Sequence, residues 1–72
     1  MDRQKMADKL IELRGDKPRM EVAEDLGISY FTLLSYETAE RVPRDEVKVK
    51  IANYYGESVE DIFFLDWMTL IV

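Results

Sequence analysis

The chain contains no cysteine and no histidine, and these two absences exclude whole classes of function. Without cysteine, neither a disulfide nor a thiolate metal site can hold a small fold together. Without histidine, the chain has neither the commonest general base nor the commonest metal ligand of proteins. A glycine-rich phosphate-binding loop is also missing. We therefore expect a protein that is not an enzyme and that uses no metal and no cofactor.

Long apolar runs are missing as well. The longest apolar stretch is far shorter than the roughly 20 residues of a membrane-spanning helix, and the N-terminus is polar, unlike a signal peptide. We therefore expect a cytoplasmic protein without a membrane partner. The 72 residues suffice for one domain with one small core. A domain of this size buries only about 60% of its unfolded-chain surface.

Basic residues are absent from the C-terminal part of the chain. All ten Lys and Arg lie within residues 1–50, whereas residues 51–72 contribute only the acids Glu57, Glu60, Asp61 and Asp66. The net charge of −5 argues against unspecific adhesion to nucleic acid. Because the acidity is concentrated at the C-terminal end, the remaining chain is close to neutral, and local clusters of bases in it can still contact DNA.

Apolar residues recur at helical spacing in five short segments that are separated by helix breakers. We expect helices over about residues 2–14, up to Leu26, over about 30–38, from near Arg44 to Gly56, and over a short segment with Ile62 and Phe63. The sequence thus predicts an all-α, compact five-helix domain over residues 1–64 and an apolar tail over residues 65–72. The residues expected to face the core are Met6, Leu10, Leu13, Met20, Val22, Ala23, Leu26, Leu33, Tyr36, Val47, Ile51, Ala52 and Tyr55. For Met20, a dimer contact is the alternative to the core.

The middle of the chain indicates two helices joined by a tight turn. Gly27 directly follows the apolar stripe that ends at Leu26, where a left-handed residue commonly ends a helix. Ser29 is then placed to cap the next helix. The small Ala23, the turn glycine and the apolar Ile28 allow the two helices to cross closely at a steep angle. This pattern is typical of a helix-turn-helix, with an ordinary helical hairpin as the alternative.

Several motifs, taken in their order and spacing, resemble the Cro/repressor (Xre-like) helix-turn-helix family. The resemblance covers about residues 5–64, most resembles small regulators of Gram-positive bacteria and their phages, and implies a lambda-repressor-like fold. The motifs are Leu13-Arg14, Glu21-Val22-Ala23-Glu24-Asp25-Leu26-Gly27-Ile28-Ser29, Tyr36-Glu37, Arg41, Pro43, Lys50-Ile51-Ala52-Asn53-Tyr54-Tyr55-Gly56 and Val59-Glu60-Asp61-Ile62-Phe63.

The resemblance implies that the helix over about residues 30–38 reads DNA in the major groove. Few of its implied base readers offer hydrogen bonds, so we expect thymine-methyl contacts from Phe31 and Leu34. The Tyr30 hydroxyl can then reach a phosphate or a base edge. The implied base readers are Tyr30, Phe31, Leu34 and Ser35, and the implied backbone contacts are Arg19, Thr32, Arg41, Arg44 and Lys48.

Two further positions take their meaning from the same resemblance. Arg14 and Glu37 match a family pair that joins the first helix to the end of the third, and we expect this pair to be partly buried. Removing one partner of such a pair costs about 3–5 kcal/mol when burial is deep. Ala39 stands where the family has a glycine. If the backbone is left-handed there, alanine costs on the order of 1 kcal/mol relative to glycine.

The C-terminal tail is apolar and rich in β-formers near its end. Because a small domain cannot expose so much apolar surface without consequence, the tail folds back onto its own core, packs against a second copy, or forms a sticky, disordered end. Trp67 would be a dimer anchor or a lid over Tyr54 and Tyr55, of which Tyr55 is expected to point inward. The candidate dimer contacts are Phe64, Trp67, Met68, Leu70 and Ile71.

Two functions from different classes follow. The first is a sequence-specific, double-stranded DNA-binding transcriptional regulator, expected as a homodimer because one short recognition helix reads too few base pairs. The second is an antitoxin-like or anti-repressor-like module on the same fold that binds a protein partner. The acidic net charge and the apolar ridge of Tyr30, Phe31 and Leu34 favour the second function. A third interpretation is that this ridge only covers core beside the tail.

Overall fold

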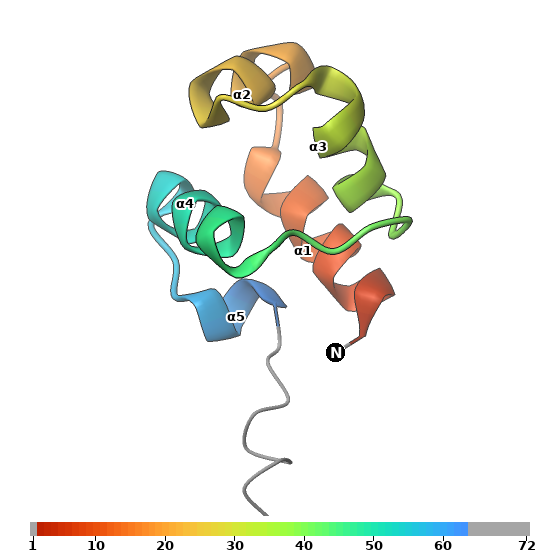
Figure 1. Ribbon diagram of the computed structural model, residues 1–72, viewed down its shortest axis with the longest axis vertical. Helices are drawn as coiled ribbons and strands as arrows, with labels where there is room; N and C mark the ends of the chain where they lie inside the picture. The colour runs from red at the N-terminus through yellow and green to blue at the C-terminus, as the bar shows by residue number, and fades with distance from the viewer. Residues whose placement is uncertain (1, 64–72) are drawn as a thin grey trace, which may run out of the picture.

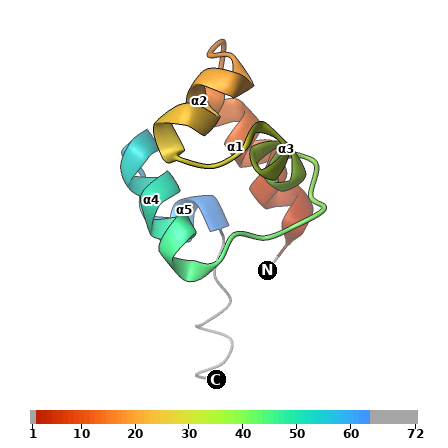
Figure 2. The ribbon, with the colours of Figure 1, turned by 45° about the horizontal axis from the view of Figure 1, so that its top comes forward.

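A computed structural model describes residues 2–63 and confirms the predicted all-α fold in this part of the chain. Five helices follow one another here, with no strand between them (Figure 1). They are α1 (Arg3–Arg14), α2 (Arg19–Leu26), α3 (Tyr30–Glu37), α4 (Asp45–Tyr55) and α5 (Val59–Phe63). α2 and α3 form one end of the molecule, and α5 lies at the other. With the top turned forward, α2 and α3 are seen to be joined by a short turn (Figure 2).

The helices begin and end at residues whose chemistry explains the boundaries. The Ser29 side chain accepts a hydrogen bond from the Thr32 N–H (3.0 Å), and Ser58 accepts one from the Asp61 N–H (3.1 Å). The predicted Ser29 cap is therefore confirmed, and Ser58 caps α5 in the same way, because each serine satisfies a backbone donor left free in the first helical turn. At the other end, Gly27 closes α2 in the left-handed conformation with φ of 71°. Only glycine adopts this conformation without steric cost.

The backbone after α3 is left-handed at a residue that is not glycine. Ala39 has φ of 65°, in the segment where the Glu40 and Arg41 N–H groups both donate to the Ser35 carbonyl (2.9 and 3.2 Å). This sharp turn ends α3 and leads the chain towards α4. Because the backbone at Ala39 is left-handed, the condition stated for this residue from the sequence is met. Its methyl group lowers the stability of the fold by on the order of 1 kcal/mol relative to glycine.

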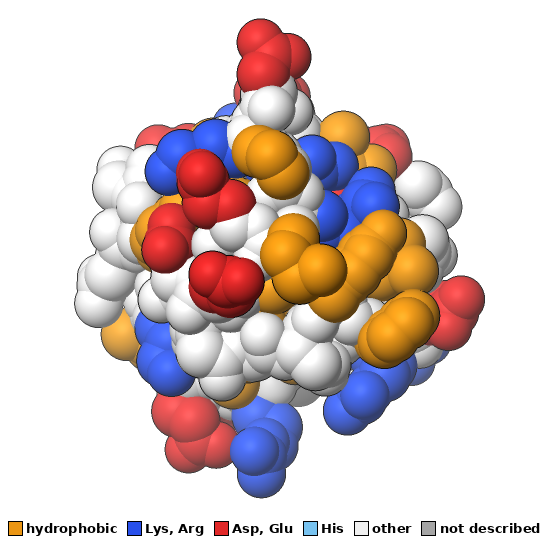
Figure 3. Space-filling view, turned by 90° about the horizontal axis from the view of Figure 1, so that it is seen from above, with side chains coloured by type: hydrophobic (Ala, Val, Ile, Leu, Met, Phe, Trp, Pro, Cys, Tyr) orange, Lys and Arg blue, Asp and Glu red, His pale blue; other side chains and the backbone are white. Residues whose placement is uncertain are grey.

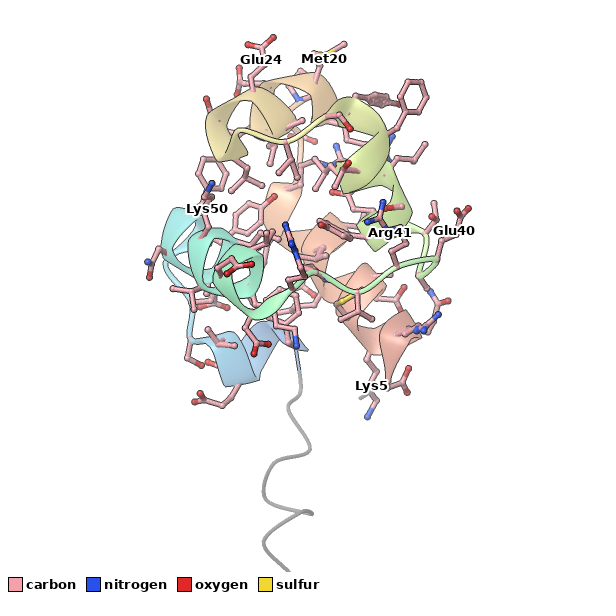
Figure 4. The ribbon with its side chains drawn as sticks, viewed as in Figure 1. Lys5, Met20, Glu24, Glu40, Arg41 and Lys50 are labelled. Atoms are coloured by element: carbon pink, nitrogen blue, oxygen red, sulfur yellow. The ribbon has the colours of Figure 1, made fainter. Side chains whose placement is uncertain are left out.

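One hydrophobic core lies between the helices, and it contains most of the residues that the periodicity predicts. Leu13, Val47 and Tyr55 are only partly buried at its edge. The core placement of Met20 is wrong, because 57% of this residue is exposed on the outer face of α2, where Figure 4 shows it pointing away from the molecule. The alternative placement in a dimer contact stays a prediction. The core residues are Met6, Leu10, Val22, Ala23, Leu26, Leu33, Tyr36, Ile51, Ala52, Ile62 and Phe63.

Among the helices of residues 2–63, none combines the length and the apolar character needed to cross a lipid bilayer.

Candidate nucleic-acid interface

α3 presents a buried face to the core and an exposed face to solvent. It buries Leu33 and Tyr36 in the core, whereas Phe31, on the opposite side, is 77% exposed. The Tyr30 ring stacks on the Phe31 ring with centroids 5.4 Å apart and planes inclined by 21°. Leu34 lies one turn further along and is half-buried. Residues three and four positions apart share a helix face, so these side chains form one apolar ridge, as the sequence predicted.

A buried carboxylate fixes the far end of α3 to the neighbouring helices. The Glu37 side chain is fully buried, and its oxygens accept hydrogen bonds from Arg14 Nε (3.2 and 2.9 Å). The predicted pair of Arg14 and Glu37 is therefore confirmed. The Arg14 side chain is itself only 14% exposed, and its Nη1 also donates to the Lys17 carbonyl (2.8 Å). The pair thus connects α1, the following turn and α3.

A second arginine completes this arrangement, and the sequence interpretation missed it. Arg19 Nε donates to Glu37 Oε1 (2.8 Å), and Arg19 Nη1 donates to the Tyr30 hydroxyl oxygen (3.3 Å). The hydrogen bond with Glu37, and after it the one with Tyr30, raises the pKa of Arg19 above its usual value. Arg19 was expected to touch phosphate, and this stays a prediction. Within the protein its guanidinium bonds residues at both ends of α3, and the one signal in the sequence was a second arginine beside the turn after α1.

The hydroxyl groups of Ser35 and Thr32 in α3 are bonded within the protein. Ser35 was predicted to face outward, and this prediction is wrong because the residue is only 9% exposed and its Oγ donates to the Thr32 carbonyl (2.6 Å). A serine inside a helix commonly bonds back to a carbonyl one turn earlier, which competes with any outward contact. Thr32 stays partly exposed, and its Oγ1 accepts a hydrogen bond from Ser29 Oγ (2.8 Å).

The three basic residues predicted to follow the recognition helix differ in how far their side chains are exposed and in the ion pairs that they form. Arg41 is exposed in the connection between α3 and α4, where Figure 4 labels it. The Arg44 side chain is 85% exposed, with only a 3.6 Å ion pair to Glu46. Lys48 is different, because its side chain is 13% exposed, pairs with Asp45 (3.5 Å) and lies 5.9 Å from the centre of the Phe63 ring. Lys48 is therefore poorly placed to grip a DNA backbone.

Charge is unevenly distributed over the end of the molecule formed by α2 and α3. Seen from that end, hydrophobic side chains gather on the α3 side with Lys and Arg around them, while Asp and Glu gather on the α2 side (Figure 3). Glu24 is one of the acids that project from α2 (Figure 4). A DNA duplex would therefore meet least repulsion if it approached from the α3 side.

Polar contacts also fix α4, which follows the candidate interface. Lys50 Nζ donates to the Leu26 carbonyl (3.2 Å), which satisfies an acceptor at the end of α2. The Tyr54 hydroxyl donates to Asp25 Oδ2 (2.7 Å) and accepts from Lys17 Nζ (3.0 Å). Tyr55 points inward, as expected, because its hydroxyl oxygen is buried. This oxygen has no hydrogen-bond partner among residues 2–63.

The buried, unpaired Tyr55 hydroxyl predicts that removing this group makes the fold more stable. Burial, reinforced by the charge of Glu37, raises the pKa of Tyr55 to about 12. Tyr55→Phe should raise the free energy of unfolding by about 1 kcal/mol, because an unpaired buried hydroxyl costs about that much or more. Urea unfolding monitored by circular dichroism measures this change. Tyr54→Phe is the matched control, and it should lower stability because it removes two hydrogen bonds.

The same substitution should alter the alkaline limit of stability. The folded state favours neutral Tyr55, so its contribution is complete below the ordinary tyrosine pKa of about 10 and is lost as pH rises towards about 12. The variant lacks this loss. The difference in unfolding free energy between Tyr55→Phe and the wild type should therefore grow between pH 10 and 12. A difference that stays constant over this range would contradict the assignment.

Other predicted sites lie outside the described residues. Phe64, Trp67, Met68, Leu70 and Ile71 were candidates for a dimer contact, and Trp67 also for a lid over Tyr54 and Tyr55. Within residues 2–63, no group of three or more acidic side chains is arranged to hold a metal ion. Comparisons of the chain with protein-family models, with curated proteins and with solved structures find no match.

Proposed function

We propose that the protein is a sequence-specific, double-stranded DNA-binding transcriptional regulator that places α3 in the major groove. The observation that carries the proposal is the fixation of α3. Glu37 ties one end of this helix to Arg14 and Arg19, and Arg19 also bonds Tyr30 at the other end. The helix is thereby presented rigidly beside α2, with its ridge outward. Such a helix-turn-helix is the arrangement that reads base edges in the major groove.

The residues around α3 suit separate roles in such a complex. Arg41 and Arg44 are exposed cations next to the helix, which supports contacts to the DNA backbone. Tyr30 and Thr32 have hydroxyl oxygens that already accept hydrogen bonds, so each keeps its proton for an acceptor such as phosphate. Contacts of this kind set register and affinity but carry no sequence information. Ser35 and Lys48 are left out of this set.

One short helix reads few base pairs, so the proposal includes a homodimer on a two-fold symmetric site in the cytoplasm. The C-terminal tail is the proposed dimer contact. Selection from a random duplex library tests both parts. An enriched, two-fold symmetric sequence would support the proposal, and failure to enrich any duplex even at low salt would overturn it.

Arg41 and Arg44 give the proposal a quantitative prediction. Replacing both with glutamine should weaken binding to every sequence and reduce the slope of log K against log salt by about four, because each subunit of the dimer loses two phosphate contacts and each contact contributes roughly one. Fluorescence anisotropy at several salt concentrations measures the slope. Lys5→Gln is the matched control, since this exposed lysine lies at the far end of α1 (Figure 4). An unchanged slope in the double variant would remove both arginines from the interface.

A protein-interaction module on the same fold is the second candidate. The observation that favours it is the pair of large apolar side chains exposed at the same end of the molecule, Phe31 and Met20. Exposed apolar surface of this kind is common at protein interfaces. A protein that captures a specific partner and enriches no duplex would support this candidate.

A further inference from the structure

α3, which lies within the described residues, has few polar side-chain atoms that are free to form hydrogen bonds with bases. The Glu37 carboxylate is occupied by Arg14 and Arg19, and Ser35 Oγ is buried against the Thr32 carbonyl. Discriminating hydrogen bonds to bases usually come from side chains with two free polar atoms, such as arginine on guanine or asparagine on adenine. α3 has no arginine, lysine, asparagine or glutamine among its eight residues. Its outward surface therefore offers mainly apolar atoms.

The apolar surface of α3 is also held in place. Phe31 is the most exposed large apolar residue of residues 2–63, and its ring stacks on the Tyr30 ring. The Tyr30 hydroxyl is in turn bonded by Arg19, whose guanidinium carbon lies 5.8 Å from the centre of the Tyr30 ring. An aromatic side chain supported from behind loses less freedom on binding, which improves its contacts.

In the major groove, the apolar group that distinguishes one base pair from another is the C5-methyl group of thymine. Cytosine has hydrogen at C5, and 5-methylcytosine has the methyl group. We infer that α3 recognises C5-methylated pyrimidines, through contacts of Phe31 and Leu34 with the methyl groups. The inference rests on the proposed function. It goes further in stating that thymine and 5-methylcytosine both satisfy this surface, whereas uracil and cytosine do not.

The inference is tested by removing or adding single methyl groups on the bases of the DNA. In the selected duplex, one thymine facing α3 is replaced by deoxyuridine, which removes the methyl group and keeps the base-pairing and hydrogen-bonding edges. Affinity should fall about three- to fivefold for each methyl group lost, the value for one buried group of that size. In a second pair of duplexes, 5-methylcytosine should bind more tightly than cytosine at the same position by a similar factor.

Protein variants show whether the ridge is responsible. Phe31→Ala should abolish the preference for thymine over deoxyuridine at the position that Phe31 contacts, and Val49→Ala, which truncates an exposed apolar residue on α4, should retain it. Equal binding of thymine and deoxyuridine duplexes by the wild type would overturn the inference and leave the proposed function standing. A methyl preference that Phe31→Ala leaves unchanged at every thymine position would also overturn it. If no duplex is enriched at all, the inference and the proposed function both fall.

Discussion

Glu37→Gln should lower the free energy of unfolding by about 3–5 kcal/mol, which is comparable with the whole stability of a domain this small. The substitution keeps the shape of the side chain but removes its charge. Two guanidinium groups, on Arg14 and Arg19, would then lie next to each other without the carboxylate that now bonds to both. Thermal and urea unfolding monitored by circular dichroism measure the loss.

The two arginines should not contribute equally. Arg14 is the more deeply buried, at 14% side-chain exposure against 27% for Arg19, and it also bonds the Lys17 carbonyl. Arg14→Met should therefore destabilise the fold more than Arg19→Met. Arg44→Gln is the control, because its exposed ion pair with Glu46 contributes little. A loss below about 1 kcal/mol for Glu37→Gln would show that Glu37 does not hold α3.

The helices and the turns between them could be predicted because their signals are local. Gly27 and Ser29 act on the residues beside them, so their roles follow from spacing alone. The contact between Arg14 and Glu37 spans 23 positions and could be expected only from the family resemblance. The bonds of Arg19 to Glu37 and Tyr30 depend on how α2 and α3 cross, which no local pattern records.

The two wrong side-chain predictions have different origins. Met20 was assigned by periodicity, which places the centre of an apolar face well and its edges poorly. Ser35 was assigned by the family resemblance, and it lies two positions from Leu33, on the opposite face of α3, where it is nevertheless buried. Serine adds an ambiguity of its own, because a hydroxyl group can either face water or bond back to its own helix.

Replacing each of the two phenylalanines of residues 2–63 with alanine should change the free energy of unfolding by very different amounts. Phe63 has no exposed surface and is the largest fully buried side chain in the core, where α5 covers α1 and α4. Phe63→Ala should cost about 3–5 kcal/mol through lost burial and the cavity that remains. Phe31 is 77% exposed, and Phe31→Ala should change the free energy of unfolding by less than about 0.5 kcal/mol.

Urea unfolding of the two variants separates residues that hold the fold from residues that are free to contact a partner. If Phe63→Ala unfolds completely, Phe63→Leu keeps the comparison open, because a substitution closer in volume should cost less than the truncation. A large loss for Phe31→Ala would contradict the exposed ridge, since it would mean that the ring is covered in the protein alone. A small loss would show that Phe31 contributes little to the stability of the fold, which leaves its ring free to contact a binding partner.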